Sequence, residues 1–221
     1  VDRGVFKVPD DVSFEKASFT EPLACVLRGQ QRANLEAGQS VIVLGSGLTG
    51  LLHINLARIL GAGRIIATDI VDYRLQAALQ FGADNTISAT EDVPLKLREV
   101  NDGRLADLVI VCTGALPALQ QALQSVERGG TILFFAPTQP GVDLPVSVNE
   151  TFFRNDATLT TTYAASPSNL AQSLELIRAG GVKVEEMISH RLGLDDIGLG
   201  FKLTSEAQDS LKVIVEPQRQ G

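Results

Sequence analysis

Short apolar runs rich in β-branched residues alternate, through the middle of the chain, with stretches in which apolar residues recur at helical spacing. The runs that predict strands lie at residues 40–45, 64–69, 85–89, 106–114, 131–137 and 157–164. The helical patterns between them lie at residues 48–61, 73–83, 94–100 and 116–130, the last expected to end at a double glycine. Because parallel strands require crossover connections, this alternation predicts an α/β fold built on a doubly wound parallel sheet of six strands.

The pattern changes after about residue 163, where one helix and two short strands replace the alternation. Ser166 suits the N-cap of this helix and Pro167 its first position. The two short strands, at residues 187–194 and 210–217, flank a weaker helix at residues 195–203. We therefore expect three parts: a lead-in (residues 1–24), a sheet domain (residues 25–163) and a return segment that forms part of a second lobe (residues 164–221).

Three glycines mark the junction between the first strand and the first helix of the sheet domain, in the order Gly45, Gly47 and Gly50. The first permits a tight turn, the second lets a diphosphate approach the backbone, and the third lets the helix pack closely on the sheet. Leu48 and Thr49 begin the helix, where free N–H groups and the positive end of the dipole suit a pyrophosphate. The junction predicts a dinucleotide site of the Rossmann type.

An acidic residue ends the next strand, at the spacing that such a site requires. The carboxylate of Asp69 can accept the ribose hydroxyls of adenosine and would repel a 2′-phosphate, which favours NAD over NADP. Arg74 argues the other way, because a guanidinium can accommodate that phosphate. Asp69 as a mere cap of the following helix is the alternative. A methyltransferase that binds S-adenosylmethionine would usually carry an acid before the first glycine, where this chain has Leu44.

Charge and composition exclude other classes of protein. The 221 residues carry a net charge of -7 and no long basic run, which disfavours nucleic-acid binding. Apolar runs stay short of the roughly 18 residues that suggest a membrane span. The two cysteines, Cys25 and Cys112, lie far apart without CxxC spacing, so we expect a reducing, cytoplasmic location. The chain starts in mid-pattern without Met, and we expect it to be the back part of a longer protein.

Several stretches occur in an order that resembles the zinc-dependent medium-chain dehydrogenases, most of all the sorbitol and threonine dehydrogenase branch. They include "VPDDVSFEKASFTEPLACV", "VIVLGSGLTGLLHINLARILGAGRIIATD", "ADLVIVCTGA", "RGGTILFFAP", "MISHRLGLDD" and "SLKVIVEP". The resemblance implies an NAD-dependent oxidoreductase in which zinc activates an alcohol or polyol and hydride passes to the nicotinamide. It also implies that residues 1–24 and 164–221 belong to a catalytic lobe whose N-terminal zinc-binding part has no counterpart here. The chain as given should then bind NAD without completing the zinc site.

Further cofactor contacts are expected where the later strands end, because ligands of such sheets lie at the carboxyl ends of the strands. Thr113 and Gly114 end one strand and are candidates to line a ribose. Phe135 and Ala136 end the next, where the family's backbone meets the nicotinamide amide. For all four residues, packing within the sheet is the competing explanation.

The resemblance also suggests roles for two charged residues. Glu21 matches a family glutamate that ligates or neighbours the catalytic zinc, although an acid also suits the start of a helix. Arg154 matches an arginine near the substrate pocket of polyol dehydrogenases, and a surface ion pair is the alternative. The two histidines, His53 and His190, are expected to be structural.

Two further expectations concern function and assembly. Family members commonly associate by joining sheet edges, and residues 142–148 lie where that contact would form, so we expect a homo-oligomer. The alternative to an oxidoreductase is a non-catalytic NAD-binding module that acts as a sensor or interaction protein.

Overall fold

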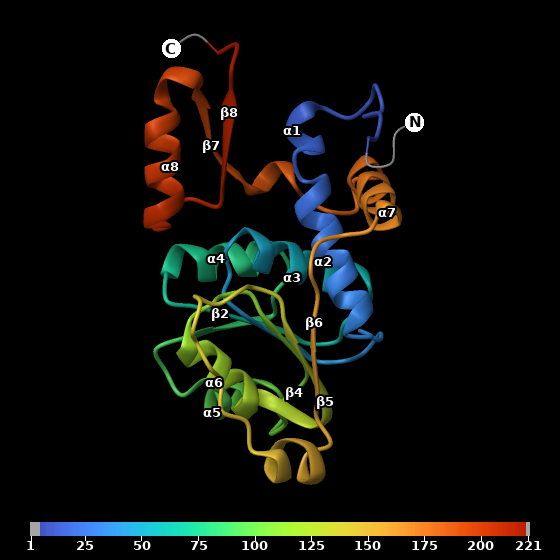
Figure 1. Cartoon of the computed structure of the whole chain (residues 1–221), viewed down its shortest axis with the longest axis vertical. Coiled ribbons are helices and arrows are strands. Elements are labelled where there is room, and N and C mark those ends of the chain that lie inside the picture. Colours follow the sequence, from blue (N-terminus) through green and yellow to red (C-terminus); the bar gives the residue numbers. More distant parts are fainter. Residues whose placement is uncertain (1–4, 220–221) are drawn as a thin grey trace.

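A computed structural model describes residues 5–219 of the chain. Its larger sheet, in the lower half of Figure 1, has six parallel strands in the order β3-β2-β1-β4-β5-β6. The strands are β1 (Val41–Leu44), β2 (Ile65–Asp69), β3 (Asn85–Ser88), β4 (Ala106–Val111), β5 (Val126–Phe134) and β6 (Thr158–Thr161). The strand order reverses between β1 and β4, so their carboxyl ends diverge and leave a crevice. The predicted doubly wound α/β fold is confirmed.

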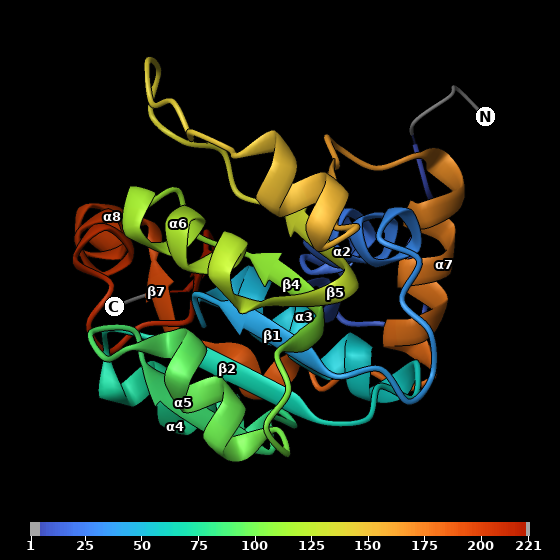
Figure 2. The same cartoon turned by 90° about the horizontal axis from the view of Figure 1, so that it is seen from below.

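Helices cover both faces of this sheet (Figure 2). One face carries α2 (Thr20–Arg32), α3 (Leu48–Ile59) and α4 (Asp72–Gln80), with α7 (Pro167–Arg178) packed outside α2. The other face carries α5 (Val93–Val100) and α6 (Leu116–Ser125). Because both faces are covered, the central strands can be apolar throughout, and β1 and β2 are buried at every position.

Alternate side chains of β1 belong to two separate hydrophobic cores. Val41 and Val43 pack with α2 and α3, whereas Ile42 and Leu44 pack with α5 and α6. The period of two along a strand sends successive side chains to opposite faces, which is why one apolar run fills both cores. Each such side chain contributes about 1.5–3 kcal/mol when fully buried.

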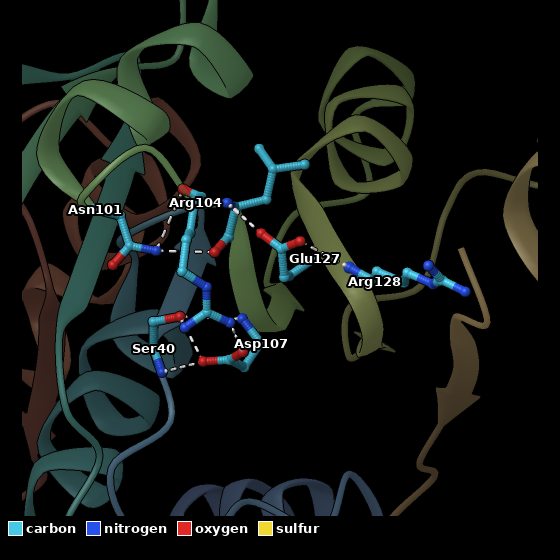
Figure 3. A network of polar contacts seen from close by, with 7 residues as sticks. Ser40, Asn101, Arg104, Asp107, Glu127 and Arg128 are labelled. Atoms are coloured by element: carbon cyan, nitrogen blue, oxygen red, sulfur yellow. Dashed lines mark hydrogen bonds and ion pairs between the residues drawn. The ribbon is translucent and has the colours of Figure 1, made fainter. Parts of the chain in front are cut away.

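A network of polar contacts closes the amino-terminal edge of the sheet (Figure 3). Asp107 of β4 accepts hydrogen bonds from the backbone N–H and the hydroxyl of Ser40, both at 2.8 Å, and from Arg104 at 2.8 Å. The N–H of Leu105 donates to Glu127 of β5 at 2.8 Å. Although burial alone would raise it, the bonds from Ser40 and the charge of Arg104 hold the pKa of Asp107 below its usual range. These contacts tie β1, β4 and β5 together at the edge opposite the crevice.

Residues 188–216 of the return segment form a second, smaller unit, whereas α7 of the same segment packs on α2. The strands β7 (Ile188–Gly193) and β8 (Lys212–Glu216) pair in parallel, and α8 (Ile197–Glu206) joins them (Figure 1). Gly200 lets α8 approach this sheet, since a Cβ there would lie 3.3 Å from Leu192 and 3.5 Å from Val213. The domain boundaries at residues 24/25 and 163/164 remain predictions. The first of them falls inside α2, which continues across it without a break.

Some elements differ from those that the pattern predicted. The helix that was expected to continue to Gly130 ends at Ser125, because Val126 already pairs with Ala106 of β4 as the first residue of β5. The pattern also missed α1 (Phe14–Ala17), the π-helix η1 (Val148–Arg154) and the 3-10 turn η2 (Glu185–Met187), and the weak helix expected at residues 195–203 divides into the 3-10 turn η3 (Leu194–Asp196) and α8. Within residues 5–219, every helix is too short or too polar to cross a lipid bilayer.

Candidate functional site

The glycine junction forms a tight turn between β1 and α3. Gly45 has a φ of +98°, a conformation that residues with a Cβ rarely adopt. A Cβ on Gly50 would lie 2.0 Å from the carbonyl oxygen of Gly45, so only glycine lets α3 start this close to the turn. Gly47 is the N-cap of α3, and the first turn has neither a capping side chain nor an acidic residue. Its N–H groups are therefore free to bind an anion.

Asp69 is bonded directly to the backbone of this turn. Its Oδ2 accepts the N–H of Ser46 at 2.8 Å and its Oδ1 accepts the N–H of Val71 at 3.0 Å, and the side chain is almost fully buried. The hydroxyl of Ser46 donates to the carbonyl of Thr68 at 3.1 Å. The carboxylate at the end of β2 is thus fixed beside the glycine turn. Asp72 is the acidic residue in the first turn of α4. Asp69 precedes the N-cap residue and is not the cap of this helix.

Arg74 lies at the mouth of the same turn. Its Nη1 is 4.0 Å from Oδ2 of Asp69, and a Cβ on Gly47 would lie 3.8 Å from the same nitrogen. The guanidinium is largely buried and its Nε has no hydrogen-bond partner within the described chain. The structure therefore places side by side the acidic and the basic residue that the sequence predicts to affect cofactor preference.

Seven of the predicted cofactor residues line two separate grooves, whereas Leu48, Thr49, Gly50 and Gly114 line neither. The first, of about 310 Å³, is lined by Gly45, Gly47, Asp69, Arg74 and Thr113, among others. The second, of about 520 Å³, is lined by Phe135 and Ala136 together with apolar side chains such as Leu119, Val142 and Leu144. A larger groove of about 890 Å³ lies between α1 and β8 and contains none of the predicted cofactor residues.

Gly114 shapes the wall between the end of β4 and the segment after β5. A Cβ there would lie 2.4 Å from the carbonyl oxygen of Pro137, so the two chain segments meet at this glycine. Thr49 contacts the thiol of Cys112, whose pKa burial raises to about 12. Cys112 lines the first groove as an uncharged thiol, and we assign it a packing role.

Glu21 lies in the first turn of α2 and accepts a hydrogen bond from the thiol of Cys25 at 3.1 Å. Burial, together with the neighbouring carboxylate, raises the pKa of Cys25 to about 12. Across residues 5–219, no three side chains of His, Cys, Asp or Glu lie close enough together to hold a metal ion. A catalytic zinc site needs three protein ligands, so these residues alone do not fit a zinc ion.

Arg154 lies far from both grooves. It ends η1, which leads into the amino end of β6, whereas both grooves lie at carboxyl ends of strands. Its guanidinium is mostly exposed and pairs with Glu150 at 3.5 Å. This is the surface ion pair that the sequence left open as the alternative, and the structure gives no support to a place in the substrate pocket.

Two residues in this region had no predicted role in the site. Ser46 lies inside the glycine motif and links it to Asp69, but a motif defined by its glycines says nothing about the residue between them. His53 is wholly buried and contacts Phe135 edge-on, with ring centroids 4.5 Å apart and an interplanar angle of 87°. Its helical position indicated packing, and only the tertiary structure shows what it packs against.

Comparison with known proteins agrees with this geometry. A family model described as "Zinc-binding dehydrogenase" matches residues 49–179. D-xylulose reductase of Saccharomyces cerevisiae is 28% identical over 96% of this chain and 60% of its own length. L-threonine 3-dehydrogenase of Bacillus velezensis is 33% identical over 97% of this chain and 62% of its own length.

Solved structures show the same fold. A Sinorhizobium meliloti protein crystallised with NADP superposes with a TM-score of 0.87 at 26% identity, over 96% of this chain and 62% of that one. The chain spans about 60% of the length of the curated relatives that it matches. The family match covers more than half of the chain, including Asp69, Arg74, Thr113 and the second groove. This chain belongs to the zinc-binding dehydrogenase family.

Proposed function

We propose that this chain is the cofactor-binding part of a zinc-dependent oxidoreductase that transfers hydride from an alcohol or polyol to NAD. Relatives of this chain include a D-xylulose reductase, a sorbitol dehydrogenase and an L-threonine 3-dehydrogenase, which supports the reaction class. The observation that carries the proposal is the direct bond between Asp69 and the backbone of the glycine turn. That bond sets a ribose acceptor beside the free N–H groups of α3.

The residues present fit a dinucleotide. The unobstructed turn at Gly45 and Gly47 and the uncapped first turn of α3 would hold the pyrophosphate. Asp69 would accept the ribose hydroxyls, since its two oxygens have lone pairs beyond the two N–H bonds that they already accept. Bound NAD supplies the hydride acceptor. The backbone at Phe135 and Ala136 would hold the nicotinamide half in the second groove.

NAD is the proposed cofactor, although a relative of known structure binds NADP. Asp69 is buried and anchored at the turn, so its charge would meet a 2′-phosphate at short range, whereas the Arg74 guanidinium already lies 4.0 Å from that carboxylate. Zinc is assigned to the complete enzyme, with Glu21 as one oxygen ligand.

Titration calorimetry with NADH, NADPH and S-adenosylmethionine tests the proposal. The chain is expected to bind NADH more tightly than NADPH and to give no signal with S-adenosylmethionine. Asp69→Ala should weaken NADH binding about tenfold or more, which corresponds to about 1.4 kcal/mol or more. Asp72→Ala is the matched control, because it removes an exposed carboxylate only three residues away.

Each other outcome rejects a different part of the proposal. Tighter binding of NADPH would refute the cofactor choice, and binding of S-adenosylmethionine would refute the reaction class. An Asp69→Ala variant that binds NADH as well as the Asp72→Ala control would refute the role of the carboxylate.

The proposal includes a homodimer formed through the edge strand β6, which within residues 5–219 pairs with β5 alone. Residues 142–148, where the sequence placed this contact, form no strand and lead into η1. Beside that edge, η1 exposes Val148 and Phe153, the latter to 80%. Exposed apolar side chains next to an unpaired strand favour edge-to-edge association. Sedimentation equilibrium should give a dimer that Phe153→Glu dissociates, while Phe14→Glu, at an equally exposed site on α1, should not. A monomeric wild-type chain would contradict this part.

A further inference from the structure

A buried contact links the start of the sheet domain to the second groove. His53 of α3 is completely buried, and its ring meets the ring of Phe135 edge-on at 4.5 Å. Phe135 directly follows β5, where its N–H and that of Ala136 both donate to the carbonyl of Val111 at 3.0 Å. The end of β5 is therefore held by β4 through its backbone and by α3 through the Phe135 ring.

His53 is itself fixed from the side of α2. The Nε2 of Gln30 donates to the backbone carbonyl of His53 at 2.8 Å and lies 3.1 Å from the ring Nδ1. With the amide as donor, Nδ1 accepts and the ring proton lies on Nε2. Burial lowers the pKa of His53 to about 3, so the ring is neutral at physiological pH.

The contacts of His53 with Gln30 and Phe135 fix the orientation of the two rings more than they stabilise the fold. Within the described residues, Nε2 of His53 and Oε1 of Gln30 are buried without a hydrogen-bond partner. Unpaired buried polar atoms make such a pair less favourable than aliphatic side chains of the same volume. The bonds to Gln30 do fix the plane of the imidazole, and the imidazole in turn fixes the Phe135 ring.

Gly29 closes the same contact from α2. A Cβ there would lie 3.2 Å from Leu133, 3.3 Å from Phe135 and 3.4 Å from His53. These separations are tight for a Cβ, so a single methyl group would press on both rings at once. Three elements, α2, α3 and the end of β5, thus share one close contact.

We propose that the Gly29–His53–Phe135 contact positions the end of β5 for the nicotinamide half of the dinucleotide, with His53 as a positioning residue. The inference rests on the proposed function. Phe135 lines the second groove, whereas His53, Gly29 and Phe135 are all absent from the lining of the first, where Asp69 lies. Disturbing the contact therefore weakens binding of the nicotinamide half and leaves binding of the adenosine half unchanged.

The test compares NADH with ADP-ribose, which has the adenosine and pyrophosphate but no nicotinamide. His53→Leu and Gly29→Ala should each raise the Kd for NADH about tenfold, equivalent to about 1.4 kcal/mol. The Kd for ADP-ribose should stay within about twofold of wild type, and the fluorescence of bound NADH should shift toward that of free NADH. Asp69→Asn is the control, because it should weaken both ligands.

Comparing the two ligands distinguishes general structural damage, which weakens both, from a loss of positioning, which weakens NADH alone. Loss of both ligands to the same degree, or unchanged NADH binding in both variants, overturns the proposal. If His53→Leu fails to fold, Gly29→Ala and Phe135→Leu carry the test, since neither leaves a new polar atom unpaired. A wild-type chain that binds neither ligand overturns the proposed function as well, which distinguishes the two failures.

Discussion

The burial of His53 predicts that the stability of the folded chain falls as the pH is lowered. Its imidazole is fully buried, and burial lowers its pKa to about 3 from an ordinary value near 6.5. As pH falls below about 6.5, this residue binds a proton in the unfolded chain but stays unprotonated in the folded chain. The stabilising contribution is thus complete above the unfolded pKa and is lost as pH falls toward the folded pKa.

The size of the effect follows from these two pKa values. Lowering the pH from 7.0 to 5.5 should reduce the free energy of unfolding by about 1.3 kcal/mol through His53 alone. A pH of 5.5 also stays above the isoelectric point near 4.9, where precipitation would interfere. The chain has no Trp, so urea unfolding is best followed by far-ultraviolet circular dichroism.

The comparison with His53→Gln isolates this contribution. The variant should lose about 1.3 kcal/mol less than wild type between the two pH values, whatever its stability at pH 7.0. His190→Gln, which removes the other histidine, should keep the contribution of His53. Equal losses in wild type and His53→Gln would show that the imidazole titrates normally, and the burial argument would be refuted.

Four substitutions test other parts of the structure. Gly50→Ala places a Cβ 2.0 Å from a backbone oxygen and should lower both Tm and NADH affinity, whereas Gly198→Ala on α8, with open space around it, should raise stability by up to about 1 kcal/mol. Asp107→Asn should cost about 1–3 kcal/mol in urea unfolding at pH 7, and the deficit should shrink as acid protonates the wild-type carboxylate. Ser166→Ala removes the capping box of α7 and should cost about 1 kcal/mol in unfolding free energy without changing NADH affinity.

The local signals of the sequence were sufficient for most of the fold. Apolar runs buried on both faces, glycines at a strand–helix junction and the capping residues of α7 each act within a few positions along the chain. The pattern failed where a competing long-range contact decided the outcome. Residues 126–128 have no strong strand signal, yet they extend because Val126 pairs with Ala106 of β4.

The site divides in the same way. The sequence predicted the glycine turn and the acid at the end of β2, because the geometry of one β-α-β unit brings Asp69 to Gly45 and Gly47. The sequence could not reveal that η1 places Arg154 at the amino end of β6, or that His53 meets Phe135. Periodicity determines which face of an element is apolar, but the partners of that face depend on how all the crossovers pack together. Only the tertiary structure decides those contacts.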